Sequence, residues 1–440
     1  MSSLEHTESS ATVSLSKANN ARIGVEQTES VSFPCRFCGT AVRHTFVDLG
    51  MSPLCESYLS VQQLNEMEPF YPLHVFVCEN CFLVQLQEYV SVESIFGEYA
   101  YFSSYSESWL AHAKAYTEKM IERFALGQKS QVVELASNDG YLLQYFVQAS
   151  VPVLGIEPAA NVAAVAIKKG VPTLVKFFNQ ESAEELAAQG IKADLLLGNN
   201  VLAQVPELNS FVSGMKILLK PNGVITMEFP HIIKLMEQGQ LDTIYHEHFS
   251  YFSLLAAEKI FSSHHLTLFD LEELPTHGGS LRIYACHEED RSKGLSSRVL
   301  SVRAAEEAAG LSKIESYSYF AERTKETKCA LLEFLIHARR NGKQVAGYGA
   351  PGKGNTLLNY CGIRSDLLSF TVDRNPYKQG KYLPGSHIPI YAPENIRVTR
   401  PDYVLILPWN LKDEIMQQLA YIREWGGKFV VPIPSVRVYP

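Results

Sequence analysis

Short apolar runs alternate with helical stretches between residues 132 and 228. The apolar runs cover residues 132–136, 153–158, 193–200 and 223–228. Parallel strands need a long crossover, and a helix usually forms it, so this alternation is typical of a parallel sheet covered by helices. Ligands of such sheets bind at the carboxyl ends of the strands. The pattern therefore predicts an α/β domain of the doubly wound, Rossmann-like type.

The turn after the first run and the acid after the second predict a cofactor site. The turn reads Ser137-Asn138-Asp139-Gly140 and lacks the GxGxxG pattern, so a dinucleotide pyrophosphate would fit poorly. Glu157 ends the second run, where an acid commonly binds a ribose diol. One glycine and an Asn–Asp pair favour a cofactor without phosphate.

Two Cys-x-x-Cys pairs, Cys35/Cys38 and Cys78/Cys81, predict a zinc site near the N-terminus. Each pair presents two thiolates to one ion, and four cysteine ligands close the tetrahedron, so the metal would be structural. A redox pair is the alternative for a single Cys-x-x-Cys, but two pairs favour zinc. Cys55 lies between the pairs and is expected to be a buried thiol.

The stretch 245–252 concentrates groups that can transfer protons. Tyr245 is followed by His246, Glu247 and His248. Histidine titrates near neutral pH, a carboxylate can orient its ring, and a phenol can bond an oxyanion. The alternative is an aromatic strand or turn whose histidines merely bond to neighbours. The spacing differs from the HExxH of zinc proteases.

The aromatic segment 99–109 precedes a helical pattern that runs to about residue 124. It is either a helix entry packed on the core or a lid whose tyrosines cover a ligand. Further along, residues 277–284 read as a turn entering an edge strand. Arg282 in that strand would either hold a phosphate or lie exposed on the sheet.

Residues 345–356 read as a strand, a glycine-rich loop and a helix start, which suits an anion at the helix N-terminus. Lys353 does not stand in a Walker A pattern, so an ATP-hydrolysing P-loop is not expected. Strands at 370–373 and 403–409 complete a second, smaller α/β domain, which a charged helical connector over about 290–342 precedes.

Composition places the chain among ordinary globular proteins, with 46% hydrophobic and 20% charged residues and a net charge of −8. Basic residues are dispersed, so we expect no nucleic-acid partner. No apolar run is long enough to cross a membrane, and no secretory signal is expected. We therefore expect a cytoplasmic protein of two or three domains with a disordered tail over residues 1–30. The oligomeric state is not indicated.

The motifs together resemble one family. These motifs occur in the order that is typical of the family. They are the two cysteine pairs, the turn at 137–140, Asn199-Asn200, the motif at 245–248, His277-Gly-Gly-Ser280 and Gly347-Tyr-Gly-Ala-Pro351. They resemble the S-adenosylmethionine-dependent C-methyltransferases of deoxysugar biosynthesis, such as the C-3 methyltransferases of dTDP-4-keto-deoxysugars. The resemblance implies a zinc-binding domain over 31–92, a methyltransferase domain over 93–289, and a connector with a C-terminal α/β domain over 290–440.

The resemblance also implies a mechanism and a set of site residues. His248 would remove the proton next to a ketone, with Tyr245 and Glu247 positioning the base or the keto oxygen, and the enolate would attack the methyl group of S-adenosylmethionine. The residues expected to bind this cofactor are Asn138, Asp139, Gly140, Glu157, Asn199 and Asn200. The residues expected to bind the small-molecule nucleotide-sugar are Ser280, Arg282 and Lys353.

One residue departs from the family pattern. Gln204 stands where a histidine is expected, and glutamine cannot transfer protons at neutral pH. This departure leaves the sugar and the methylated carbon open. The alternatives are a methyltransferase of another small molecule, at oxygen or nitrogen, and a zinc-containing binding protein without catalysis.

Overall fold

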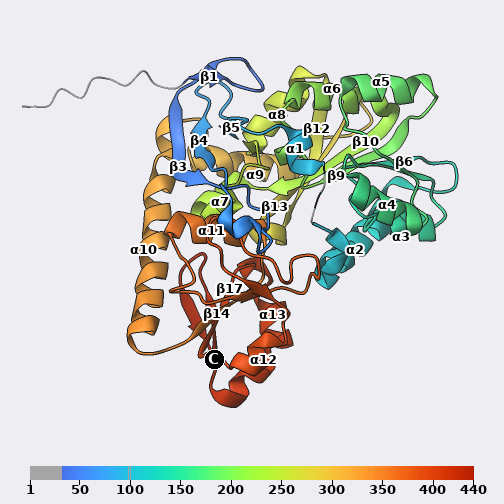
Figure 1. The fold of residues 1–440 in the computed structure, drawn as a ribbon. Helices are drawn as coiled ribbons and strands as arrows, with labels where there is room; N and C mark the ends of the chain where they lie inside the picture. The colour runs from blue at the N-terminus through green and yellow to red at the C-terminus, as the bar shows by residue number, and fades with distance from the viewer. Residues whose placement is uncertain (1–31, 98, 100) are drawn as a thin grey trace, which may run out of the picture.

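The computed structural model describes residues 32–97, 99 and 101–440 (Figure 1). The tail expected over residues 1–30 lies outside the described residues. The described strands form sheets of two, four, six and seven strands. The two larger sheets carry the two predicted α/β domains.

A small β domain contains the cysteine pairs. Its strands are β1 Phe33–Pro34, β2 Ala41–Val42, β3 His44–Ser52, β4 Tyr71–Val77 and β5 Val84–Leu86, and the short helix α1 Val92–Phe96 follows. The sheet order is β11-β5-β4-β3, in which β11 Ser250–Tyr251 comes from a distant part of the chain. The motif at 245–248 directly precedes β11. The zinc-domain sheet therefore fixes where that motif lies.

The seven-stranded sheet has the order β12-β13-β10-β9-β6-β7-β8. Its parallel strands are β6 Val132–Leu135, β7 Val153–Ile156, β8 Thr173–Leu174, β9 Ala193–Asn199 and β10 Leu219–Pro230. The antiparallel strands are β12 Leu266–Leu274 and β13 Ser280–His287. The predicted doubly wound α/β fold is confirmed.

Helices cover both faces of this sheet. The helices are α2 Glu107–Phe124, α3 Leu143–Gln148, α4 Ala160–Lys168, α5 Gln180–Ala188, α6 Leu208–Leu218, α8 Leu254–Ser263 and α9 Ser297–Ala308. The helix α7 Ile232–Gln238 packs instead in the core that contains the zinc and C-terminal domains. One apolar core contains residues of α5, α6, α8 and α9, and another contains residues of α2, α3 and α4. The carboxyl ends of the parallel strands remain open for a ligand.

The prediction that residues 277–284 enter an edge strand is wrong. β13 lies between β10 and β12, so it is paired on both sides. The edge is formed by β12, which the sequence did not reveal as a strand. A residue on β13 therefore faces partners on two neighbouring strands.

The C-terminal domain is the second α/β unit. Its sheet has the order β16-β15-β14-β17-β18-β19. The strands are β14 Val345–Tyr348, β15 Thr371–Val372, β16 Ile390–Tyr391, β17 Tyr403–Ile406, β18 Lys428–Val431 and β19 Arg437–Tyr439, of which β19 alone is antiparallel. The helices are α10 Tyr319–Arg340, α11 Gly352–Cys361, α12 Asn395–Thr399 and α13 Lys412–Gln418.

The zinc domain and the C-terminal domain share one core. Figure 1 shows α10 running alongside β3 and down the flank of the C-terminal domain. Phe46 of β3 stacks on Phe320 of α10, with ring centroids 4.6 Å apart and planes 6° apart. Leu59 exchanges backbone hydrogen bonds with Tyr382 of the C-terminal domain. Parts of the chain far apart in sequence are thus packed as one body around the site.

Within the part of the chain that the structure describes, we find no helix with both the length and the apolar character that crossing a membrane requires.

Candidate active site

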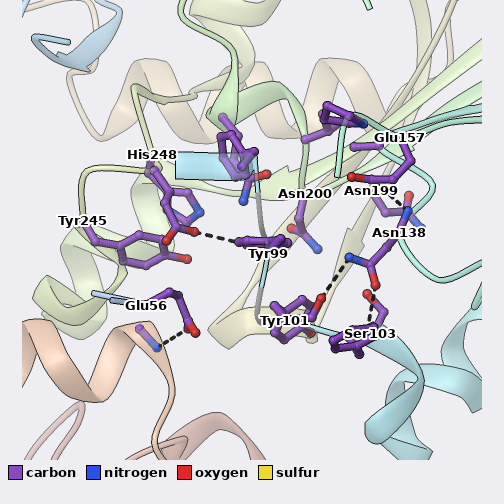
Figure 2. Close-up of a pocket in the computed structure, with 18 of the residues that line it drawn as sticks. Glu56, Tyr99, Tyr101, Ser103, Asn138, Glu157, Asn199, Asn200, Tyr245 and His248 are labelled. Atoms are coloured by element: carbon purple, nitrogen blue, oxygen red, sulfur yellow. Dashed lines mark hydrogen bonds between the residues drawn. The ribbon is translucent and has the colours of Figure 1, made fainter. Parts of the chain in front are cut away.

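A cavity of about 780 Å³ lies where the seven-stranded sheet meets the C-terminal domain (Figure 2). The carboxyl ends of β6, β7, β9 and β10 contribute Ala136, Glu157, Asn199 and Pro230 to its wall. The zinc domain and the C-terminal domain contribute further residues to the same wall. The volume is in the upper part of the range for small-molecule pockets, about 300–1,000 Å³.

Asn138 and Glu157 lie at one end of the cavity. The Asn138 and Ala159 backbone N–H groups each donate to one Glu157 carboxylate oxygen, at 2.9 Å. The Asn138 side chain donates a hydrogen bond to the Tyr101 carbonyl and accepts one from the Ser103 N–H (Figure 2). These two bonds hold the aromatic segment beside the turn. Burial raises the pKa of Glu157. The remaining lone pairs of this carboxylate are available to hydroxyl donors.

Asn199 and Asn200 bring amide groups to the same end of the cavity. The Asn200 Oδ1 atom is buried and has no hydrogen-bond partner among the described residues. The Asn199 amide lies beside the Tyr141 hydroxyl without a hydrogen bond of normal geometry. Buried polar groups are rarely left unbonded, so a ligand is expected to complete these. The set fits S-adenosylmethionine, whose amino-acid end offers an ammonium and a carboxylate and whose ribose offers a diol.

Two predicted cofactor residues lie outside the lining of the cavity. The Asp139 carboxylate pairs with Lys169 at 3.1 Å. Gly140 has φ +74°, and a Cβ there would come within 3.1–3.3 Å of Val171 and Ala166. Asp139 and Gly140 therefore shape the turn from behind, and their direct contacts with the cofactor stay a prediction.

His248 has a defined tautomer. Its Nδ1 lies 2.8 Å from the carbonyl oxygen of Thr243, which can only accept a hydrogen bond, so Nδ1 carries the proton. Nε2 is then the unprotonated atom of a residue that lines the cavity. Burial lowers the pKa of His248 to about 4, and the charge of Lys353 contributes. The ring is therefore neutral near pH 7 and can accept a proton.

Tyr245 and Glu247 lie beside His248 in the wall. The Tyr245 ring centroid is 4.0 Å from that of His248. The Glu247 carboxyl accepts from the Tyr99 hydroxyl at 3.2 Å and from the Cys55 thiol at 3.6 Å. Burial, reinforced by the nearby Glu56 carboxylate, raises the pKa of Glu247 to about 8. At neutral pH, Glu247 is thus predominantly protonated and can donate a hydrogen bond.

Four non-glycine residues in the cavity wall have left-handed backbone conformations. They are Ala136, Asn138, Asn200 and His277, with φ between 50° and 56°. Such conformations cost about 1–3 kcal/mol each and tend to gather at functional sites. Asparagine and histidine are enriched in this region, but alanine adopts it rarely. Four of the ten such residues in the described part of the chain therefore lie in this one cavity wall.

Ser280 and Arg282, predicted to bind the nucleotide-sugar, do not reach the cavity. Arg282 stands opposite both Glu228 and Glu272 in the sheet, and its guanidinium pairs with them at 2.7 and 3.1 Å. Ser280 donates its hydroxyl to the carbonyl of Thr276. The prediction that they bind substrate is corrected: β13 is an inner strand, so Arg282 bonds within the sheet.

The glycine-rich loop before α11 already binds two anions of the chain itself. The Ala350 N–H donates to Asp373 at 2.7 Å, and the Gly352 N–H donates to Glu56 at 3.0 Å. Lys378 pairs with the other oxygen of Glu56 at 3.3 Å. Lys353, in the first turn of α11, lines the cavity.

Several cavity residues were not among the predicted site residues. They are Glu56, Tyr99, His277 and Lys378. Tyr99 and His277 belong to motifs that the sequence does display, and the Asn200 amide donates to His277 Nε2 at 3.0 Å. Glu56 has no comparable signal, because nothing in the sequence near Cys55 indicates a contact about 300 residues away. Gln204 also lines the cavity.

The four paired cysteines come together in the zinc domain. Their sulfur atoms lie within 4.8 Å of one another, with Cys35 and Cys81 3.6 Å apart and Cys38 and Cys78 3.6 Å apart. Tetrahedral zinc with bonds of about 2.3 Å places sulfurs about 3.8 Å apart, so this arrangement fits the ion. The Gln85 amide donates to Cys35 Sγ at 3.1 Å, a typical outer contact of a metal thiolate.

Family models match three consecutive parts of the chain. A zinc binding domain matches residues 35–96, a methyltransferase domain matches 109–270, and a C-methyltransferase C-terminal domain matches 275–434. C-methyltransferase NovU from Streptomyces niveus is 37% identical over 404 residues, covering 92% of this chain and 96% of the relative.

Solved structures resemble a smaller part of the chain. A S-adenosylmethionine-dependent methyltransferase from Clostridium acetobutylicum has a TM-score of 0.32 and 10% identity, covering 40% of this chain and 92% of its own. Magnesium protoporphyrin IX methyltransferase from Synechocystis has a TM-score of 0.33 and 14% identity, covering 40% and 83%. The three domain matches and the full-length relative, taken together, show that this chain belongs to the family of S-adenosylmethionine-dependent C-methyltransferases with an N-terminal zinc-binding domain.

Proposed function

We propose that this chain methylates the carbon next to the ketone of a nucleotide-linked 4-keto-deoxysugar, after His248 removes a proton from that carbon. The observation that carries the proposal is the hydrogen bond from His248 Nδ1 to the Thr243 carbonyl. This bond leaves Nε2 as a proton acceptor in the cavity wall. Methylation at oxygen or nitrogen has less need of such a base.

The surrounding groups support proton abstraction. A hydrogen next to a ketone is removed only while the charge that develops on oxygen is stabilised. Burial keeps the Tyr245 hydroxyl protonated by raising its pKa, and Glu247 is protonated for the same reason. Both residues can therefore donate hydrogen bonds beside the base.

S-adenosylmethionine, when bound, supplies the electrophilic methyl group. The residues that we propose hold it are Asn138, Glu157, Asn199 and Asn200, which meet at one end of the cavity. His248 and Tyr245 line the same cavity, so a cofactor and an acceptor could lie in contact. Holding the two reactants in contact makes the methyl transfer effectively unimolecular, which lowers its activation barrier.

The acceptor class rests on the resemblance of the motifs and on the composition of the wall. The C-terminal domain lines the cavity with Asn375, Lys378 and Asn410, polar groups that suit a sugar or its nucleotide. Gln204 can hydrogen-bond a hydroxyl or a keto group and takes no part in our proposed proton transfer. We place the reaction in the cytoplasm, since Cys329 is an exposed thiol and the four clustered cysteines suit a reducing compartment.

The experiment that tests the proposal follows two mass changes separately. The protein is incubated with a panel of dTDP-4-keto-deoxysugars in deuterated water, with and without S-adenosylmethionine. We expect deuterium uptake next to the ketone without the cofactor, and one added methyl group on carbon with it. The variant His248→Gln should lose both signals, by about 10²–10⁴-fold in rate.

The matched control is His265→Asn, which removes an exposed histidine from the same domain and places asparagine at a left-handed φ that it tolerates. This variant should behave as the wild type. Methylation of oxygen or nitrogen in place of carbon, or a His248→Gln variant with normal exchange, would contradict the proposal.

A further inference from the structure

The Lys353 side chain ends in a buried amine without a hydrogen bond. Its Nζ atom is buried and finds no hydrogen-bond partner among residues 32–97, 99 and 101–440. The amine lies 5.6 Å from the ring centroid of Trp409, so one side of it meets an aromatic face. Burying an ammonium without a partner is costly. The burial of this amine in a cavity wall therefore indicates a function that offsets its loss of stability.

The charged neighbour of this amine is already engaged through one of its two oxygens. Asp242 is the carboxylate whose field acts on Lys353, and its Oδ2 accepts from the Trp409 indole N–H at 2.6 Å. Burial raises the pKa of Asp242 to about 6, and its Oδ1 atom has no hydrogen-bond partner among the described residues. Burial in turn lowers the pKa of Lys353. The amine therefore remains available to a ligand.

The same amine lies close to the proposed base. Burial first, and the charge of Lys353 second, lower the pKa of His248 to about 4 and that of His277 to about 3. All three residues line one cavity. Both imidazoles are neutral near pH 7, and Lys353 is the lysine whose charge acts on both of them.

A weakly basic imidazole alone cannot explain removal of a hydrogen next to a ketone. A base of low pKa gives little driving force for the transfer, so the developing negative charge on oxygen must be stabilised strongly. Tyr245 and Glu247 can donate hydrogen bonds but carry no positive charge. A desolvated ammonium stabilises an oxyanion far more than it would in water.

We propose that Lys353 is a catalytic residue that binds the ketone oxygen of the acceptor and stabilises the enolate formed when His248 removes the adjacent proton. This inference rests on the function proposed above and adds a role from the C-terminal domain. In the step, the C–H bond breaks and its proton moves to His248 Nε2. The C–H electron pair forms the C=C bond, and the π pair of the carbonyl moves to oxygen. The Lys353 ammonium donates a hydrogen bond to that oxygen throughout.

The test measures enolisation in the absence of S-adenosylmethionine. Wild type, Lys353→Met and Lys353→Arg are incubated with dTDP-4-keto-deoxysugars in deuterated water, and deuterium uptake is followed by mass spectrometry. We expect Lys353→Met to slow exchange by about 10²–10³-fold, the effect of removing an oxyanion donor. The KM of the sugar and the affinity for S-adenosylmethionine should change less than about threefold. Lys353→Arg, which keeps the charge, should retain part of the exchange.

Thermal unfolding separates this role from a structural one. Methionine replaces the stem of lysine without its unpaired charge, so Lys353→Met should unfold at the same or a higher temperature than the wild type. The control is Lys343→Met, which removes a lysine that pairs with Asp402 at the surface of the same domain. This variant should exchange deuterium at the wild-type rate.

Each other result overturns the inference. Normal exchange by Lys353→Met, while the wild type exchanges and methylates, removes Lys353 from the step and leaves the proposed function standing. A loss confined to KM, or to cofactor affinity, would make Lys353 a binding group for a phosphate or a carboxylate. A variant that fails to fold would show that the amine has a structural role. A wild type that exchanges no deuterium would overturn both proposals.

Discussion

Gln85 lies directly opposite Ser250 where β5 pairs with β11. The Gln85 side chain also donates to Cys35 Sγ and accepts from the backbone of Arg36, so it joins the cysteine cluster to the strand that follows His248. The segment that carries the base and the metal site are thus linked through two adjacent strands, β11 and β5. The geometry of one depends on the integrity of the other.

Removal of zinc should therefore disturb the active site as well as the small domain. We expect about one zinc per chain, and we expect Cys78→Ser to lose most of it and to lower the unfolding temperature, because metal binding contributes directly to folding. Deuterium exchange next to the ketone should fall with metal content. Metal analysis and calorimetry check this, with Cys329→Ser as the control at an exposed cysteine. A metal-free protein with native stability and activity would contradict it.

Glu157 should control the affinity for S-adenosylmethionine. Loss of a charged hydrogen bond to a ligand costs about 1.5–3 kcal/mol, so we expect Glu157→Gln to weaken binding by about 10–100-fold. Glutamine keeps one acceptor oxygen, for either the Asn138 or the Ala159 N–H, and the fold should survive. Calorimetric titration measures the affinity, and Glu181→Gln, on the exposed first turn of α5, is the control. An unchanged affinity would exclude the ribose contact.

Glu247 should make the protein less stable as pH rises. Its folded pKa of about 8 lies above the unfolded value of 4.5, so the folded state binds more protons between these values. The stabilisation is complete below about pH 4.5 and is lost as pH rises through about 8.

The variant Glu247→Gln should remove this contribution, which amounts to at most about 1.4 kcal/mol per pH unit. Denaturant unfolding should be measured at pH 5.5, 7 and 8.5. The free energy of unfolding of the variant, relative to that of the wild type, should rise at each step. The control is Glu273→Gln, at an exposed glutamate of β12. Its free energy of unfolding should depend on pH in the same way as that of the wild type. A constant difference between Glu247→Gln and wild type would refute the raised pKa.

Arg282 should matter for stability and not for substrate affinity. Removing one partner of a buried ion pair leaves the other charge unpaired and costs about 3–5 kcal/mol, so Arg282→Met should lower the free energy of unfolding by that order. The hydrogen bond with His112 and the charge of Arg282 hold the pKa of Glu228 at about 2 against the effect of burial, and the variant would remove the second of these contributions. Kinetics at a temperature where the variant remains folded should give an unchanged KM for the acceptor. A selective rise in KM would restore the substrate role.

The sequence predicts what depends on neighbours along the chain. The strands at 132–135 and 153–156 follow from their apolar runs, and the cysteine pairs follow from their spacing. Arg282 was misjudged because its role depends on β12, whose pattern of charges conceals a strand. The Glu56 contact with Gly352 could not be foreseen, since it depends on tertiary packing across the whole chain.

The clamp made by Glu56 and Leu59 on the C-terminal domain also limits how such proteins can be recombined. Chimeras that exchange only the C-terminal part, in the hope of changing the acceptor, would separate Glu56 from Gly352 and Leu59 from Tyr382. A chimera that keeps these contacts must exchange the segment between the cysteine pairs together with the C-terminal domain that it contacts. The segment around Glu56 and the C-terminal domain therefore have to be exchanged as one unit, although they lie far apart in the chain.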